Sequence, residues 1–153
     1  MHAKKKCKAC NTVKIKNRKQ TSFKSHTTSK EYQIKKLITC ATTHVTYLIT
    51  CPCGLQYVGR TTRKLSIRIG EHLNNIKKGF KKHSLSMHFR IYHNRDPTLA
   101  QFCGIDTVES HWRGGNRKIA ISKNETFWIC ELDTIQPKGM NKDLDINCFI
   151  SNY

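Results

Sequence analysis

The sequence predicts an α+β fold in which short strands and amphipathic helices form a single domain. Three segments are rich in β-branched and aromatic residues, which are typical of strands. Three others repeat apolar residues at the spacing of an α-helix. A chain of 153 residues, 37% of them hydrophobic, is long enough for one domain with a modest core.

The first two predicted strands form a β-hairpin. Residues 45–50 read VTYLIT, residues 51–54 are a turn with the sequence CPCG, and residues 55–59 make the second strand. Tyr47 and Tyr57 could therefore lie side by side on adjacent strands. A third strand is predicted over residues 102–108.

Three helices are predicted around the third strand. The first begins at a threonine cap, Thr61 or Thr62, and ends at Gly79. Its apolar residues at helical spacing are Leu65, Ile69, Leu73 and Ile76. The second helix covers residues 84–92, and the third runs from about residue 122 to residue 135, ending near Pro137.

Positive charge is concentrated near the N-terminus. The chain has 28 Lys+Arg against 10 Asp+Glu, and the first forty residues hold twelve of the basic residues and one acid. We therefore expect a basic, Lys-rich, partly disordered extension at residues 1–37, a short strand at residues 32–38, and a domain at residues 38–150. This charge predicts a polyanionic partner, and nucleic acid is the commonest one.

Several classes of protein are excluded by the same survey. No apolar run approaches the ~20 residues of a membrane-spanning helix, and no apolar segment follows the first lysines as in a secretory signal. We expect no membrane partner and an intracellular, nuclear location. Lysines of the extension are predicted to contact DNA phosphates, or alternatively to form a nuclear-import patch or a solubilising tail: Lys4, Lys5, Lys6 and Lys8.

The eight cysteines favour metal binding or packing over disulfides, because nothing in the sequence indicates secretion. Cys51 and Cys53 form a CxC motif, and histidines follow at positions 72, 83, 88 and 93. Thiolates and imidazoles are the ligands that zinc prefers. The role of a second motif, CxxC at residues 7–10, stays open.

Three polar residues border the apolar faces of the predicted helices. Glu125 interrupts the apolar stripe of the third helix, and a buried carboxylate needs a cation, a donor or a metal. Glu125 is either a residue at the edge of the buried helix face, paired with a Lys or Arg, or a metal ligand. Arg68 and His72 are neighbours on the first helix. Arg68 is either a functional group or a solvated charge on the helix. His72 is either a functional group or a packed or capping imidazole.

Taken in order, these residues resemble the GIY-YIG nuclease domain over roughly residues 38–150. The likeness is closest to the version at the C-terminal end of Penelope-like retroelement polyproteins. The first motif of this sequence reads Val45-Thr46-Tyr47, and the second reads Tyr57-Val58-Gly59, with valine in place of isoleucine. The other matching segments are Cys51-Pro52-Cys53-Gly54, Arg68, Glu71-His72, His88, His93, His111-Trp112-Arg113-Gly114-Gly115, Glu125-Thr126-Phe127-Trp128-Ile129, Asn141 and Asn147-Cys148-Phe149-Ile150.

The resemblance implies a small three-stranded antiparallel sheet flanked by helices, and an endonuclease that hydrolyses DNA phosphodiesters with a divalent metal, by nicking. Glu125 would hold one Mg²⁺ or Mn²⁺, and Arg68 would clamp the scissile phosphate. Tyr47 would help to activate the attacking water, with Tyr57 beside it and His72 orienting the tyrosine or assisting proton transfer. Asn141 would be the last member of the site, and Arg60 and Arg63 would contact the DNA backbone.

The resemblance also implies a structural zinc site at Cys51, Cys53, His88 and His93, which would join the second helix to the hairpin. Five residues turn a helix by ~500°, so His93 must lie at or beyond the helix end to converge with His88. His83 could replace either histidine, and Cys40 could join the site. A reverse-transcriptase domain outside this chain would be a further partner. The competing hypothesis is a non-catalytic basic zinc module that binds nucleic acid, and a weaker one is a regulatory protein with the fold alone. Only a nuclease needs Tyr47, Arg68 and Glu125 together.

Overall fold

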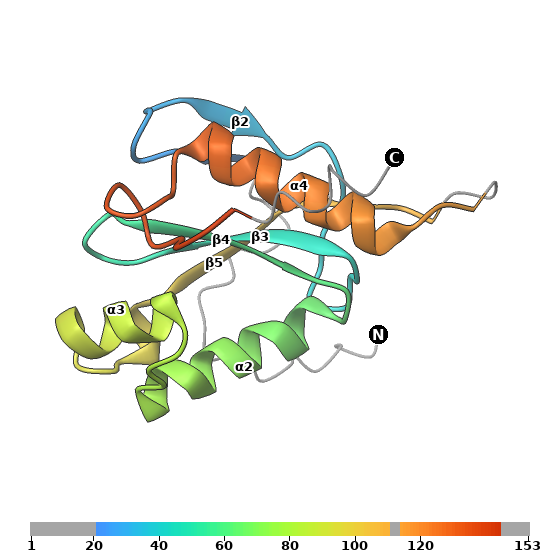
Figure 1. Ribbon diagram of the computed structural model, residues 1–153. Helices are drawn as coiled ribbons and strands as arrows, with labels where there is room; N and C mark the ends of the chain where they lie inside the picture. Colours follow the sequence, from blue (N-terminus) through green and yellow to red (C-terminus); the bar gives the residue numbers. More distant parts are fainter. Residues whose placement is uncertain (1–20, 111–113, 145–153) are drawn as a thin grey trace, which may run out of the picture.

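The computed structural model describes residues 21–110 and 114–144 (Figure 1). The described elements follow one another along the chain as β1 (Ser22–Lys24), β2 (Glu31–Gln33), β3 (Val45–Thr50), β4 (Gln56–Thr61), α2 (Leu65–Lys78), α3 (Ser84–Tyr92), the 3₁₀ turn η1 (Pro97–Leu99), β5 (Gln101–Thr107) and α4 (Arg117–Leu132). This order confirms the predicted α+β class and each of the three predicted helices.

The main sheet has the order β4-β3-β5, and both pairings are antiparallel. β3 lies in the centre, so its first five residues are all buried. In the β3–β4 register Tyr47 faces Gly59 and Ile49 faces Tyr57. The two tyrosines therefore point to the same face of the sheet from neighbouring strands, as the hairpin predicts.

Two layers enclose the sheet (Figure 1): α2 and α3 cover one face, and α4 with the β1–β2 hairpin covers the other. The face toward α2 and α3 packs Tyr47, Ile69 and Phe89 into one apolar cluster. The opposite face packs Leu48, Val58 and other apolar residues against α4. Each helix layer thus buries its apolar stripe on the strands that carry the predicted site residues.

The β1–β2 hairpin is a folded part of the segment predicted as a partly disordered extension. Its strands place Phe23 opposite Tyr32, and both rings pack against Trp128 of α4, with centroid distances of 5.2 and 5.3 Å. The strand expected near residues 32–38 is shorter and spans Glu31–Gln33. Lysines 4, 5, 6 and 8 and cysteines 7 and 10 lie outside the described residues.

Two helix starts differ from the sequence prediction. Neither Thr61 nor Thr62 caps α2; the N-cap is Lys64, without a side-chain cap, because Thr61 ends β4 and accepts a hydrogen bond from the Arg63 amide. α4 begins at Arg117, five residues earlier than predicted, because the Asn116 side chain accepts from the Lys118 and Ile119 amides. Within the described residues, none of the helices combines the length and apolarity that crossing a bilayer requires.

Candidate active site and metal centre

Tyr47 is fully buried at the middle of β3, and glycine on the neighbouring strand makes room for it. A Cβ atom at Gly59 would lie 2.4 Å from the Tyr47 hydroxyl oxygen, much closer than van der Waals contact. The glycine of the second tyrosine motif is therefore required by the ring that lies over it. It lets the tyrosine hydroxyl extend across β4 toward α2.

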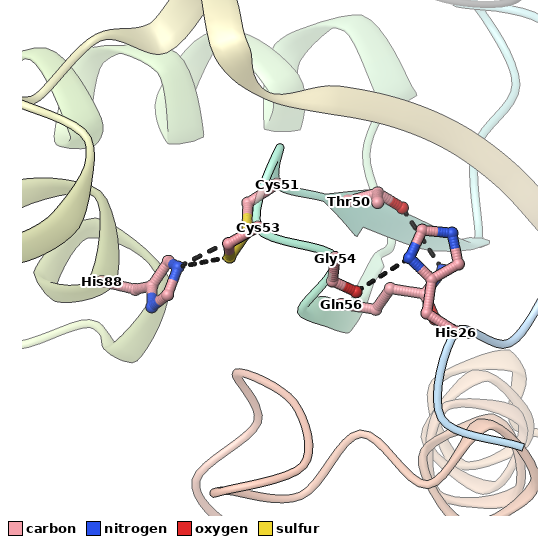
Figure 2. Close-up of a disulfide and its surroundings, with 7 residues drawn as sticks. All are labelled: His26, Thr50, Cys51, Cys53, Gly54, Gln56 and His88. Atoms are coloured by element: carbon pink, nitrogen blue, oxygen red, sulfur yellow. Dashed lines mark hydrogen bonds between the residues drawn. A yellow bond between two sulfur atoms is a disulfide. The ribbon is translucent and has the colours of Figure 1, made fainter.

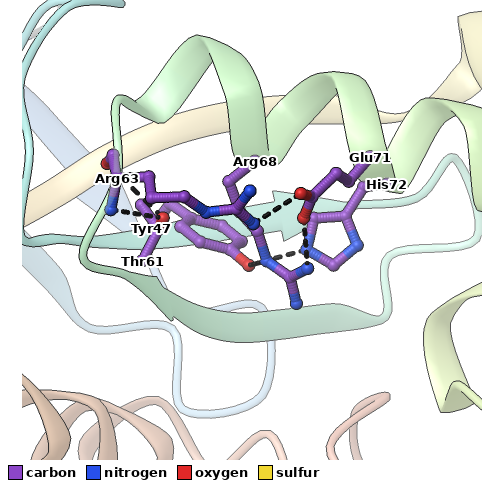
Figure 3. Close-up of polar contacts among 6 residues, drawn as sticks. All are labelled: Tyr47, Thr61, Arg63, Arg68, Glu71 and His72. Carbon is purple, nitrogen blue, oxygen red and sulfur yellow. Dashed lines mark hydrogen bonds and ion pairs between the residues drawn. The ribbon is translucent and has the colours of Figure 1, made fainter.

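α2 brings Arg68 and His72 onto that hydroxyl (Figure 3). The Arg68 Nε–H donates to the Tyr47 oxygen at 3.2 Å, and His72 Nε2 lies 2.6 Å from the same oxygen. Arg68 can only donate, and in the His72 tautomer whose Nε2 is unprotonated the Tyr47 hydroxyl donates its own proton to that nitrogen. The three residues thus form a directed chain of hydrogen bonds.

The protonation states support this direction. Burial, followed by the nearby Arg68 charge, lowers the pKa of His72 to about 3, so the imidazole is neutral at neutral pH and one of its two ring nitrogens can accept a hydrogen bond. Burial raises the pKa of Tyr47 far above its ordinary value, and burial with the Glu125 charge also raises the pKa of Tyr57. Both phenols are therefore protonated in the free protein, and Tyr47 becomes a base only if its proton moves to His72 at the same time.

The lowered pKa of His72 predicts a loss of stability in acid. Below about pH 6.5 the unfolded chain binds a proton at His72, whereas the folded chain does not bind one until the pH approaches 3. The free energy of unfolding therefore falls as the pH drops from about 6.5 toward 3, by up to about 5 kcal/mol. Denaturant unfolding of the wild type and His72→Gln between pH 7 and pH 4 measures this. The variant, which has no titrating imidazole there, should lose less stability; equal losses would contradict the assignment.

Glu71 is a positioning residue that the sequence analysis did not assign a role. Its carboxylate accepts from Arg68 Nη1 at 2.9 Å and also pairs with Arg63 (Figure 3). These hydrogen bonds outweigh its partial desolvation and lower the pKa of Glu71. The sequence could have indicated this ion pair, because Glu71 follows Arg68 by three residues on one helix and such residues are neighbours. Arg63, predicted to contact DNA, is placed beside Arg68 by this shared acid.

Glu125 lies on the other layer, on α4, and forms an ion pair with Arg60 of β4. Its side chain is only 14% exposed. Both face a cleft of ≈ 370 Å³ along the edge of the sheet, where Tyr57 from β4 meets Lys82 and His83 from the α2–α3 loop. The edge of β4 is thus the place where side chains from both layers reach one cavity.

Asn141 lines the same cleft, but its amide is engaged with the main chain of β4. Its Oδ1 accepts from the Val58 amide at 2.8 Å, and its Nδ2 donates to the Val58 carbonyl at 2.8 Å. The Thr134 hydroxyl also donates to Oδ1, at 2.7 Å. Asn141 therefore pairs with the outer edge of β4 like a strand residue, and it fixes the strand that carries Tyr57.

Four predicted zinc ligands meet at the tip of the hairpin: Cys51, Cys53, His88 and His93, whose ligand atoms all lie within 4.8 Å of one another. His88 Nε2 is 3.4 Å from the Cys51 sulfur and 3.2 Å from the Cys53 sulfur (Figure 2). His93 is the residue after α3, as convergence with His88 requires. His83 and Cys40, which the sequence left as alternatives, are not in this group.

The two cysteines are joined by a disulfide in the structure, a pairing that the sequence analysis disfavoured. A disulfide explains why the two sulfur atoms are close together, but it does not explain why two histidines converge on them. His93 Nε2 is buried and has no hydrogen-bond partner among the described residues, an arrangement that is costly unless a ligand completes it. The donor set of two sulfurs and two imidazoles fits zinc once the cysteines are reduced to thiolates.

Fold and site together define a small α+β domain with a hydrogen-bonded tyrosine, arginine and histidine beside a carboxylate in a basic cleft, a composition suited to hydrolysis of a phosphate ester. A family model, the GIY-YIG catalytic domain, matches residues 43–133. The match covers more than half of the chain, which therefore belongs to this family, as the sequence motifs predict. It is a nuclease domain that hydrolyses phosphodiester bonds.

A solved structure shows the same fold. A mutant of the catalytic domain of intron endonuclease I-TevI is 20% identical, with a TM-score of 0.51 over 65% of this chain and 93% of that one. A second structure of the catalytic domain of homing endonuclease I-TevI is also 20% identical, with a TM-score of 0.49 over 65% of this chain and 97% of that one. No curated protein gives a significant match.

Proposed function

We propose that the chain is a DNA endonuclease that depends on one Mg²⁺ or Mn²⁺ held by Glu125. The observation that carries this proposal is the hydrogen-bonded set of Tyr47, His72 and Arg68. Tyr57 connects this set to the cleft that contains Glu125, because its ring packs against His72 and also lines the cleft. A hard cation suits this position, because Mg²⁺ takes one or two carboxylates, several waters and the phosphate of its substrate. Such an ion stabilises negative charge on the phosphate.

The residues of the chain have separate roles in this proposal. The Tyr47 hydroxyl takes a proton from the attacking water while its own proton moves to His72 Nε2. This transfer leaves the tyrosine neutral throughout, which its raised pKa requires. Arg68, held by Glu71, places its guanidinium beside the same hydroxyl and stabilises charge on the nonbridging oxygens. Asn141 acts through β4 as a positioning residue.

We further propose that zinc joins α3 to the tip of the β3–β4 hairpin through the four clustered ligands. The site has four protein ligands, which is the composition of a structural zinc site and leaves no open position for substrate. Its place on the chain, with two cysteines between the tyrosine motifs and two histidines downstream, supports a relation to Penelope-like elements. A nuclear location remains a prediction from the basic composition.

The test of function is nicking of supercoiled plasmid by reduced, zinc-loaded protein. We expect conversion to the relaxed circle with Mg²⁺ or Mn²⁺, and none when EDTA is added just before the DNA. A protein that shifts the plasmid on a gel but never nicks it, with either metal, would favour the non-catalytic nucleic-acid-binding module instead.

Tyr47→Phe should reduce the single-turnover nicking rate by about 10²- to 10⁴-fold, because the variant has no hydroxyl to relay the proton to His72. Its folded structure should persist, since the ring still fills the space over Gly59. The matched control is Tyr92→Phe, which removes a hydroxyl from a tyrosine 69% exposed on α3. A rate for Tyr47→Phe within threefold of the control would exclude the proposed relay.

A further inference from the structure

The most basic run of the described chain covers the end of α2 and the loop that leads to α3: Lys77-Lys78-Gly79-Phe80-Lys81-Lys82. The four lysines are exposed, and within residues 21–110 and 114–144 none of them forms an ion pair. No acidic residue occurs in the sequence between Glu71 and Asp96. A run of four like charges without counter-charges attracts a polyanion.

An exposed aromatic ring lies in the middle of this loop. Phe80 is 41% exposed, and its ring centroid is 5.3 Å from that of His83. The loop holds the ring in a defined place: Gly79 turns the chain at φ 66°, the Phe80 amide donates to the Asn75 carbonyl at 3.0 Å, and the Ser86 hydroxyl donates to the Phe80 carbonyl. The main chain that carries the exposed Phe80 ring is therefore held at both its amide and its carbonyl.

The loop is continuous with the active-site cleft. Lys82 and His83 line the cleft together with Tyr57 and Glu125, and Phe80 contacts His83 from outside it. A strand whose scissile phosphate lies near Glu125 would therefore pass directly over this loop. Its phosphates would meet the lysines, and its bases would meet the ring.

We propose that residues 77–83 bind an unpaired nucleotide next to the scissile phosphate, with the lysines on the backbone and Phe80 stacked on the base. This inference rests on the proposed function and specifies its substrate class: DNA that is single-stranded at the cut, as in a flap, gap or melted segment. Exposed bases offer a π-face to an aromatic ring, whereas bases inside a duplex are already stacked on each other.

Binding measured by fluorescence anisotropy tests the proposal, with Glu125→Gln as the non-cleaving background. The probes are a paired duplex and the same duplex with a single-stranded flap. Phe80→Leu, which keeps an apolar side chain but has no π-face, should weaken flap binding about tenfold, because the variant cannot stack on the unpaired base. It should leave duplex binding within twofold, and Phe80→Trp should restore flap binding. Phe127→Leu, at another exposed phenylalanine, is the control and should change neither.

Equal flap affinities of Phe80→Leu and the background, or an equal loss on flap and duplex, would overturn the stacking role. Tighter binding of an RNA strand than of the DNA flap would overturn the assignment to DNA. Plasmid nicking by the wild type is scored separately. If the wild type nicks the plasmid but Phe80→Leu binds the flap normally, only the stacking role of Phe80 is refuted. If flap binding depends on Phe80 but the wild type never nicks the plasmid, only the proposed nuclease activity is refuted.

Discussion

Replacing Glu125 with glutamine is expected to lower the rate of DNA cleavage on the order of 10⁴-fold, while DNA binding stays at least as tight. Glutamine keeps the shape of the side chain but has no charge with which to hold a hard cation. A loss of about 5 kcal/mol of transition-state stabilisation corresponds to this factor. Single-turnover nicking measures the rate, and Mn²⁺ binding followed by electron paramagnetic resonance measures the metal directly.

The ion pair with Arg60 makes a matched control necessary, because Glu125→Gln also breaks that contact. Arg60→Gln breaks the same ion pair from the other side and leaves the carboxylate in place. It should weaken DNA binding by less than about tenfold, as expected for one phosphate contact, and keep Mn²⁺ binding. If Arg60→Gln abolished cleavage as completely as Glu125→Gln, the ion pair rather than the metal would explain the effect.

Much of the candidate site follows from residue spacing within single elements. Arg68 and His72 are four apart on a helix, so they share a face, and the turn between the tyrosines sets their register on the hairpin. Local spacing therefore predicts which side chains approach the Tyr47 hydroxyl. It also predicts His93 at the end of α3, because only there can it converge with His88.

Contacts between distant elements could not be predicted in this way. The pairing of Glu125 with Arg60 joins α4 to β4, and the sequence could only state that Glu125 needs some partner. Asn141 contacts the Val58 main chain, a role that no periodic pattern reveals. β1 and its pairing with β2 were missed because the lysines and polar residues of this segment resemble a solvated chain, whereas two rings, Phe23 and Tyr32, attach the hairpin to Trp128.

The second large effect is expected at the zinc site. Reduced protein should bind one zinc per chain, and Cys53→Ser should bind it far more weakly and melt about 10 °C lower or more. Structural zinc contributes several kcal/mol to folding, and ~1 kcal/mol shifts the melting temperature of a domain of this size by about 2–4 °C. The matched control is Cys130→Ser, an exposed cysteine on α4 outside the ligand group, which should retain zinc and stability.

Removal of zinc should act on α3 first, because the metal would be its link to the hairpin through His88 and His93. Hydrogen exchange of the reduced protein with and without chelator should show lost protection over residues 84–93, while β3 at the sheet centre keeps its own. The disulfide between Cys51 and Cys53 provides the opposing hypothesis. If protein purified with reductant contains no zinc, and reductant alone lowers the stability as much as Cys53→Ser does, the cysteines serve as a covalent link and the metal site is refuted.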